Sequence, residues 1–187
     1  MKKTKWLPLS KINPNNFPIN LKPWLIDPLS MTARFKRVCG DKFYLKLLSQ
    51  SEAEVSSGEL AFLGLKPARG HVIREIEMGG DAIPWLFGRS VFPENLFEGR
   101  TAEYFRDLGG KPLGEILFKD PMLTRTEFEI ALICPSDEEY KLVENFIAVP
   151  IPVWARRSLF NFMQKKIMLT EIFLPTMPFY SKDASSV

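Results

Sequence analysis

Histidine and cysteine are scarce in this chain of 187 residues, and their scarcity excludes several kinds of site. The one histidine, His71, belongs to no recognisable nucleophile motif, and one histidine with two cysteines offers no zinc-ligand spacing. Cys39 and Cys134 form no disulfide framework, so we expect two inert, reduced thiols. The glycine patterns of phosphate loops and dinucleotide sites are also missing. We therefore expect neither a metal nor a cofactor.

Long apolar runs and a strong charge are missing as well. No run approaches the ~20 apolar residues that a membrane span needs, and the basic start MKKTKWLPLSKINP lacks the apolar core of a signal peptide. The net charge of +3 is too small to indicate nucleic acid or a membrane surface as a partner. A hydrophobic content of 45% is ordinary for a globular protein, and the chain is long enough for one domain with a substantial core. We expect a cytoplasmic protein.

Hydrophobic periodicity and turn signals predict an α+β fold. Helices are expected over 31–38, which Ser30 caps, over 101–108 and from Pro112 onward. Strands are expected over 42–49, 71–78, 83–92, 123–134, 154–162 and 167–174. Along the chain the expected order is helices, strands, helices, strands, with hairpins between neighbouring strands. This order favours a single, mostly antiparallel sheet with helices over alternating βαβ units.

The whole chain, residues 1–187, is expected to form one domain with three peripheral segments. Residues 1–24 are expected to be a loosely attached arm, and residues 181–187 a disordered tail. Residues 135–152 begin acidic and become rich in proline, which indicates an excursion from the core. The connection over 50–69 has no clear pattern.

The last predicted strand carries the residue around which a functional hypothesis can be built. Neither face of residues 167–174 is polar, so this strand is expected at the centre of the sheet, covered on both sides. Glu171 shares its face with Ile167, Leu169 and Phe173. A carboxylate among buried hydrophobic side chains is unfavourable unless a partner binds it or it takes up a proton.

Two arginines, Arg74 and Arg89, also lie on strand faces that are otherwise apolar. Either one can form a structural salt bridge with Glu171. Two arginines against one glutamate leave a surplus positive charge, however, and an arginine fork binds a carboxylate through two parallel hydrogen bonds. The helix starts at Met31 and Leu113 add unpaired backbone N–H groups, which favour anions, although their side chains are typical of core packing. The pattern indicates a site for an anionic small molecule.

Seven motifs, in this order, resemble the bacterial chorismate pyruvate-lyase family: SMTARF, IREI, PWLFGRSVFP, LGGKPLGEILF, LTR, WARRS and MLTEIFLP. The resemblance runs from about Leu25 to Tyr180. It is patchy over 38–68 and absent through 135–152, which therefore looks like an insertion. The last hairpin turn, expected at 164–166, also lacks the glycine that the family pattern implies.

The resemblance implies an enzyme that converts chorismate to 4-hydroxybenzoate and pyruvate, the first step of ubiquinone head-group synthesis. It implies a monomer without metal or cofactor, with one antiparallel sheet and a ligand site closed under helical flaps. By motif matching, Arg74 resembles the arginine that holds the ring carboxylate, and Glu171 the acid that meets the ring hydroxyl. Met31 and Leu113 resemble flap positions that close on the ligand. Arg89 lies in a matching GR motif and is expected to help receive the second carboxylate of chorismate.

Two questions stay open at the level of sequence. Glu171 is either a general base or only a hydrogen-bond partner for the hydroxyl, and a hydrogen transfer within the substrate would need no protein base. The same fold also resembles the effector-binding domain of certain transcription regulators, which bind small molecules without catalysis. Those regulators carry a DNA-binding domain ahead of it, and only about two dozen residues precede the match here. A non-catalytic domain that binds an aromatic carboxylate is the alternative function.

Overall fold

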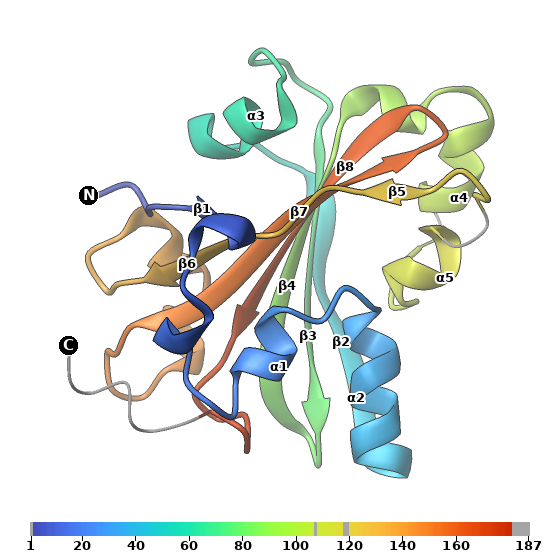
Figure 1. The fold of residues 1–187 in the computed structure, drawn as a ribbon. Coiled ribbons are helices and arrows are strands. Elements are labelled where there is room, and N and C mark those ends of the chain that lie inside the picture. Colours follow the sequence, from blue (N-terminus) through green and yellow to red (C-terminus); the bar gives the residue numbers. More distant parts are fainter. Residues whose placement is uncertain (1, 107, 118–119, 181–187) are drawn as a thin grey trace.

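A single antiparallel sheet forms the centre of the computed structural model, which describes residues 2–106, 108–117 and 120–180 (Figure 1). In spatial order its strands are β1 (Leu7–Pro8), β6 (Glu129–Ile133), β7 (Val153–Phe162), β8 (Lys165–Phe173), β4 (Ile83–Phe92), β3 (Val72–Gly80) and β2 (Phe43–Glu52), with β5 (Thr124–Arg125) also paired to β7. The α+β prediction is confirmed. As expected, the strand that carries Glu171 lies inside the sheet, between β4 and β7.

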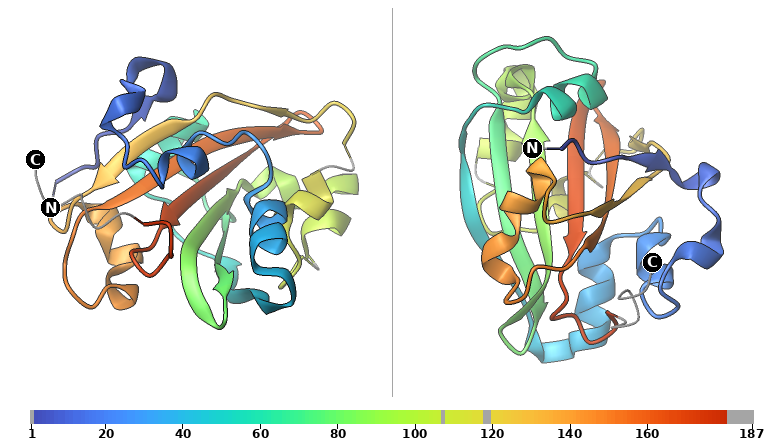
Figure 2. Two further views of the ribbon diagram at one scale, coloured as in Figure 1. Left: turned by 60° about the horizontal axis from the view of Figure 1, so that its bottom comes forward. Right: turned by 90° about the vertical axis from the view of Figure 1, so that its left-hand side faces the viewer.

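Five short helices cover the sheet: α1 (Lys22–Leu25), α2 (Met31–Cys39), α3 (Ser57–Leu63), α4 (Ala102–Arg106) and α5 (Leu113–Leu117). The Ser30 hydroxyl caps α2 by accepting a hydrogen bond from the Ala33 N–H at 3.3 Å, and the helix ends at Gly40, as the sequence predicts. In Figure 2, α1 and α2 lie on one side of the sheet, whereas the 3-10 turns η6 (Glu138–Leu142) and η7 (Glu144–Phe146) lie on the other. Among the described residues no helix is long and apolar enough to cross a membrane.

Two hydrophobic clusters share the sheet face that α1, α2, α4 and α5 cover. The first, at the end covered by α1 and α2, includes Trp24, Phe35, Met78, Leu86 and Phe173. The second, at the end covered by α4 and α5, includes Phe92, Phe105, Leu113, Phe162 and Ile167. The strand residues between the two clusters on this face include Arg74, Ser90, Glu171, Arg156 and Ser158, which are buried polar side chains. A polar belt therefore interrupts an otherwise apolar surface.

Part of the segment 135–152 packs back against the sheet, so it is more closely attached than an excursion from the core implies. Its two 3-10 turns bury Tyr140 and Val143 against Phe87 and Ile172, on the face of the sheet away from the polar belt. The apolar residues within this acidic segment explain the difference, because their burial holds the segment against the sheet. It therefore does not lie over the belt.

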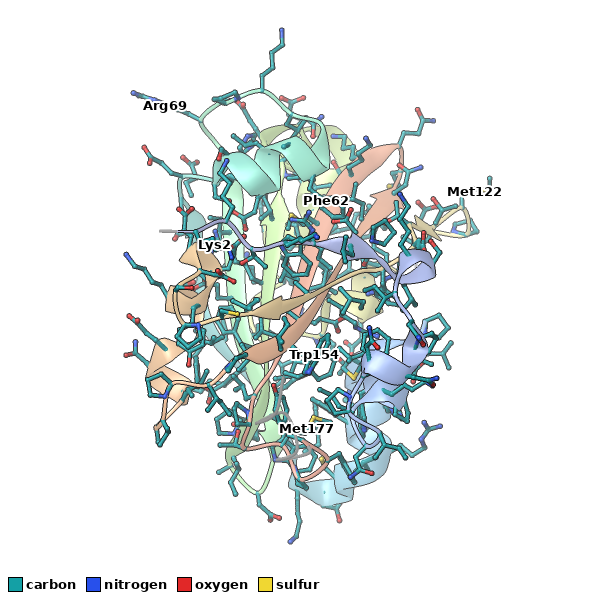
Figure 3. All side chains as sticks on the ribbon, turned by 60° about the vertical axis from the view of Figure 1, so that its left-hand side comes forward. Lys2, Phe62, Arg69, Met122, Trp154 and Met177 are labelled. Atoms are coloured by element: carbon teal, nitrogen blue, oxygen red, sulfur yellow. The ribbon has the colours of Figure 1, made fainter. Side chains whose placement is uncertain are left out.

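The first 24 residues are also more firmly attached than predicted. Strand β1 pairs with β6, and Phe17, Leu21 and Trp24 are buried. Phe17 packs edge-to-face against Trp154, which is labelled in Figure 3, with ring centroids 5.4 Å apart. The predicted tail, residues 181–187, lies outside the described residues.

Both hairpins turn at two residues each, which overlap the positions that the predicted strands leave for the turns. Between β3 and β4, Asp81 and Ala82 adopt positive φ angles, while Gly79 stays in the strand, where a Cβ atom would lie 2.0 Å from the Ile83 carbonyl oxygen. Between β7 and β8, Met163 and Gln164 adopt φ angles of 48° and 65°. The glycine expected at this turn is thus replaced by two non-glycine residues in the left-handed region, which is uncommon.

Candidate active site

A cavity of about 260 Å³ lies in the polar belt between the two clusters. Its walls come from β3, β4, β8 and β5, from the start of α2 and from α5. The polar and charged residues that line it are Ser30, Thr32, Arg74, Ser90, Thr124, Arg125 and Glu171, among apolar neighbours that include Met31 and Leu113. The volume is slightly below the roughly 300 Å³ at which small-molecule sites begin, so the cavity suits a molecule with one ring.

Strand register explains why polar side chains meet here. One row of paired positions across the sheet is Arg74, Ser90, Leu169 and Ser158, and the next is Ile76, Gly88, Glu171 and Arg156. Because β3 and β8 lie on either side of β4, two strand spacings of ~4.8 Å and an offset of ~6.8 Å along the strands separate the backbones of Arg74 and Glu171 by roughly 12 Å. This separation leaves room for a ring between a cationic end and an anionic end.

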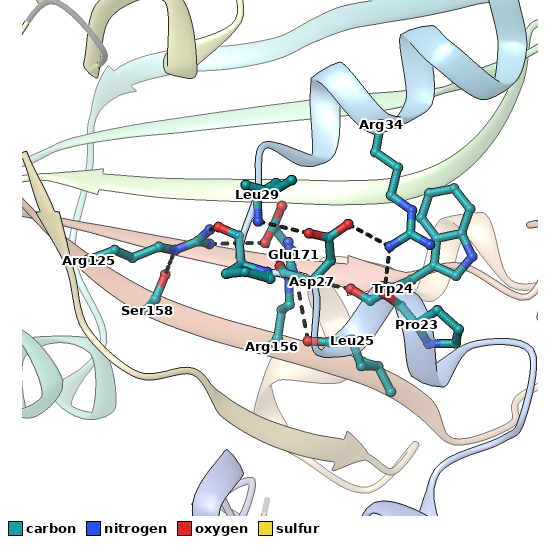
Figure 4. A network of polar contacts seen from close by, with 11 residues as sticks. Pro23, Trp24, Leu25, Asp27, Leu29, Arg34, Arg125, Arg156, Ser158 and Glu171 are labelled. Atoms are coloured by element: carbon teal, nitrogen blue, oxygen red, sulfur yellow. Dashed lines mark hydrogen bonds and ion pairs between the residues drawn. The ribbon is translucent and has the colours of Figure 1, made fainter.

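Glu171 is 4% exposed and is held by two arginines (Figure 4). Its Oε2 atom accepts a hydrogen bond from Nε of Arg156 at 2.6 Å and a longer one from Nη2 of Arg125 at 3.5 Å. Arg156 is fully buried, and its Nη1 donates to the carbonyl oxygens of Trp24 and Asp27 at 3.0 and 2.7 Å. Glu171 thus accepts hydrogen bonds from two guanidinium partners through one carboxylate oxygen.

Arg74 is 1% exposed, and no carboxylate among the described residues pairs with it. Its Nε and Nη2 atoms donate to the Gly109 carbonyl oxygen at 3.1 and 2.9 Å, and Nη2 also reaches that of Lys111 at 2.8 Å. Burial lowers the pKa of Arg74 to about 10, so the side chain is still a cation at neutral pH. Arg74 thus ties down the loop ahead of α5 and leaves Nη1 without a hydrogen-bond partner in the described part of the chain.

Arg125 reaches the same cavity through a shift in strand register. The sequence predicts one strand over 123–134, but β5 and β6 are separate: Arg125 lies opposite Phe160, whereas Glu129 lies opposite Arg157. In an unbroken strand Arg125 and Glu129 would point to the same face. The one-residue shift between the two segments turns Arg125 toward the cavity, while Glu129 pairs with Arg157 on the other face.

The structure brings together four of the five predicted site residues. Arg74, Glu171, Met31 and Leu113 all line the cavity, with Met31 and Leu113 as the first residues of α2 and α5. Neither Arg74 nor Arg89 pairs with Glu171, so the salt bridge considered from the sequence is not formed.

Arg89 is not at the cavity, and the expectation that it faces the site with Arg74 is corrected. Its strand directs Gly88 and Ser90 into the cavity and therefore directs Arg89 to the opposite face. There Arg89 donates to Glu59 at 2.7 Å and to Glu75 at 2.6 Å. Burial lowers the pKa of Arg89, but these two carboxylates outweigh it and the pKa is raised above its ordinary value.

A family model described as chorismate lyase matches residues 1–185 of the chain. The chain belongs to the chorismate lyase family. One relative, named a probable chorismate pyruvate-lyase, from Azoarcus sp. (strain BH72), is 35% identical over 161 residues, which cover 84% of this chain and 85% of that protein. A chorismate pyruvate-lyase from Yersinia enterocolitica is 36% identical over 172 residues, covering 91% and 90%.

Solved structures support the fold of this chorismate lyase family member. The C-terminal domain of PhnF matches with a TM-score of 0.57 and 12% sequence identity, covering 73% of this chain and 87% of that domain. At that identity the likeness concerns the arrangement of the chain only.

Arg125 and Arg156 are the cavity and network residues that sequence reasoning missed. The alternation of residues could have identified Arg156 in this family member. Arg156 shares one face of its strand with Trp154 and Ser158, just as Arg74 shares a strand face with apolar neighbours. Arg125 lies in the LTR motif, but periodicity could not predict its orientation, which depends on the break between β5 and β6.

Arg89→Met in this chorismate lyase family member is expected to lower stability without changing ligand affinity. Removing the guanidinium leaves two carboxylates unpaired, which costs roughly 3 kcal/mol or more of the free energy of unfolding. Burial raises the pKa of Glu59, but Arg89 outweighs this effect and the pKa lies below its ordinary value of about 4.5. The stability difference should therefore be full above pH 4.5 and shrink as the pH falls through the folded-state pKa. Urea denaturation at several pH values measures it; a weakened affinity for 4-hydroxybenzoate in the folded variant would contradict the placement.

Proposed function

We propose that this protein is a chorismate lyase, which converts chorismate to 4-hydroxybenzoate and pyruvate. The proposal rests on the excess of positive charge at the cavity, together with membership of the chorismate lyase family. Three cations, Arg74, Arg125 and Arg156, lie at or beside the cavity. Glu171 is the one anion that lines it in the described part of the chain, so a surplus of two positive charges remains. The nearby Asp27 is paired with Arg34. This surplus matches chorismate, which carries two carboxylates.

The chemistry lies mainly within the substrate. The C–H bond at the ring carbon that bears the hydroxyl breaks, and its electron pair forms the new ring double bond. The neighbouring carbon–oxygen bond breaks at the same time, and the enolpyruvyl oxygen takes that pair. The enolpyruvate accepts a proton on its methylene carbon and leaves as pyruvate, while the ring becomes aromatic. The protein has to orient a dianion and exclude water.

Four of the lining residues have proposed roles in orienting the substrate. The Nη1 atom of Arg74, which lacks a hydrogen-bond partner in the described part of the chain, binds the ring carboxylate. The ring hydroxyl donates to Glu171 at the other end of the cavity. Met31 and Leu113 close on the two sides of the ring from α2 and α5. These positions make α2 and α5 the flaps of the site.

We propose a positioning role for Glu171 and not the role of a general base. The Oε2 atom of Glu171 already accepts hydrogen bonds from Arg156 and Arg125, so a proton transferred to this atom would have to displace one of these contacts. The same carboxylate is a strong acceptor for a hydroxyl. Aromatisation supplies the driving force, so a strong base is unnecessary.

Release of pyruvate from chorismate is the experiment that tests the function. Purified protein is mixed with chorismate, pyruvate is followed with a coupled dehydrogenase, and 4-hydroxybenzoate is quantified by chromatography. The proposal requires both products in equal amounts. Binding of 4-hydroxybenzoate without any pyruvate would instead show a non-catalytic binding domain, the alternative function.

The proposed enzyme acts in the cytoplasm as a monomer and supplies the aromatic acid for ubiquinone synthesis.

Product release is expected to limit turnover. Both flaps contribute buried residues to the cavity wall. Arg74 donates hydrogen bonds to the carbonyl oxygens of Gly109 and Lys111 in the loop ahead of α5, so opening of this flap must break buried hydrogen bonds. Rapid mixing with excess chorismate should show a burst of pyruvate close to one equivalent per enzyme, followed by a slower steady rate. A linear time course from the first turnover would contradict this order of steps.

A further inference from the structure

We propose that Arg125 binds the enolpyruvyl carboxylate of chorismate, and that it leaves Glu171 in order to do so. The inference rests on the proposed function and extends it, because it assigns the second carboxylate of the substrate to the arginine of the LTR motif, to which the sequence analysis gave no role. Arg125 becomes the residue that distinguishes the dianionic substrate from the monoanionic product.

The guanidinium of Arg125 is fixed at one end and loosely held at the other. Its Nε donates to the Ser158 hydroxyl at 2.8 Å, and its plane lies over the rings of Phe128 and Phe160, 4.2 and 4.6 Å from their centroids. Its two terminal nitrogens make only long hydrogen bonds, 3.4 Å to the Pro28 carbonyl and 3.5 Å to Glu171. A carboxylate in the cavity would offer these two nitrogens shorter, bidentate bonds.

Glu171 does not depend on Arg125 for its charge balance. Arg156 already holds Glu171 through a 2.6 Å bond from a fully buried guanidinium, whereas the Arg125 side chain is 17% exposed and borders the cavity. Burial lowers the pKa of Arg125 to about 10, an effect that the Glu171 charge partly offsets, so Arg125 is a cation at neutral pH. Moving Arg125 from Glu171 to a substrate carboxylate exchanges one weak ion pair for a stronger one.

The position of Arg125 fits the connectivity of the substrate. The enolpyruvyl group is attached to the ring carbon next to the one that bears the hydroxyl. If the hydroxyl meets Glu171, the second carboxylate must lie near a neighbour of Glu171, and Arg125 is the neighbour that borders the cavity. Arg74 lies two strands away and is engaged with the other end of the ring. After the carbon–oxygen bond breaks, the carboxylate leaves with pyruvate and Arg125 can return to Glu171.

The chain provides a matched control, Arg157. This arginine also lies over two aromatic rings, Trp6 and Phe62 at 4.5 and 4.1 Å, and pairs with one carboxylate, Glu129 at 2.6 Å. It faces the opposite side of the sheet and does not border the cavity. Arg157→Met therefore removes similar aromatic packing and an ion pair that is shorter than that of Arg125, without touching the proposed subsite.

The test compares Arg125→Met with Arg157→Met, and measures kcat, KM for chorismate and the Kd of 4-hydroxybenzoate. For Arg125→Met we expect kcat/KM to fall about 10- to 100-fold, mainly through KM, with the Kd of the product within about threefold of wild type. Arg157→Met should leave all three close to wild type. Arg125→Lys, which keeps the charge but loses the fork, should recover part of the loss and serves if the methionine variant does not fold.

Two results would overturn the inference. One is an equal loss of chorismate and product affinity in a folded Arg125 variant, which would make Arg125 part of the first carboxylate site or of the general scaffold. The other is full activity of Arg125→Met. Both require an active wild type, so they are distinguishable from failure of the proposed function, in which wild type itself releases no pyruvate.

Discussion

Glu171→Gln is expected to lose both turnover and stability, because the carboxylate has two functions. It is the proposed acceptor for the ring hydroxyl, and it is also the partner of the fully buried Arg156. An amide keeps an oxygen acceptor but not the charge. Breaking a buried ion pair from one side costs about 3–5 kcal/mol, so the free energy of unfolding should fall by that amount. The kcat should fall by roughly 10² if Glu171 positions the hydroxyl, and toward 10⁴ if it is the base.

A double variant separates the two functions. Arg156→Met removes the buried cation that Glu171→Gln leaves unpaired, so the pair Arg156→Met/Glu171→Gln should regain part of the stability lost in either single variant. Turnover should not return with it, because the hydroxyl acceptor is still altered. Chemical denaturation and pyruvate release on the four proteins complete the cycle. A double variant that regains activity together with stability would mean that Glu171 acts only as a structural partner of Arg156.

Arg74→Met should produce the largest loss of product affinity. Arg74 is the cavity cation that has no carboxylate partner among the described residues, and its burial means that water cannot replace it. Truncating a buried, hydrogen-bonded charge partner typically costs 2–5 kcal/mol, which raises the Kd of 4-hydroxybenzoate by about 30- to several thousand-fold. Calorimetric titration of the folded variant measures this change, with Arg157→Met as the control for loss of a buried arginine. An unchanged Kd would exclude Arg74 as the carboxylate ligand.

The same substitution should also release the flap. Without Arg74 the carbonyl oxygens of Gly109 and Lys111 lose their donors, so the loop ahead of α5 is held less tightly. The burst of pyruvate expected for wild type should therefore disappear, because release no longer limits turnover. A burst that persists in Arg74→Met would show that another contact closes the site.

Local sequence determined the elements and most of the site. A period of two along the strands identified Arg74 and Glu171 as charged residues on apolar faces, and the cap at Ser30 located the start of α2 at Met31. These features depend on neighbours within a few positions in the chain, so periodicity and capping are sufficient to predict them. The α+β class followed from the order of the same elements.

Only the tertiary structure decided which partners meet. Alternation shows which residues of a strand share a face, but both faces of this sheet are buried, so it could not show that Arg89 lies away from the cavity. The ion pair between Arg156 and Glu171 depends on strand register, and its carbonyl partners come from the segment around Trp24, more than a hundred residues away. Arg125 enters the cavity because a one-residue shift between β5 and β6 reverses its face. Such a shift is set by packing against β7 and leaves no periodic signal in the sequence.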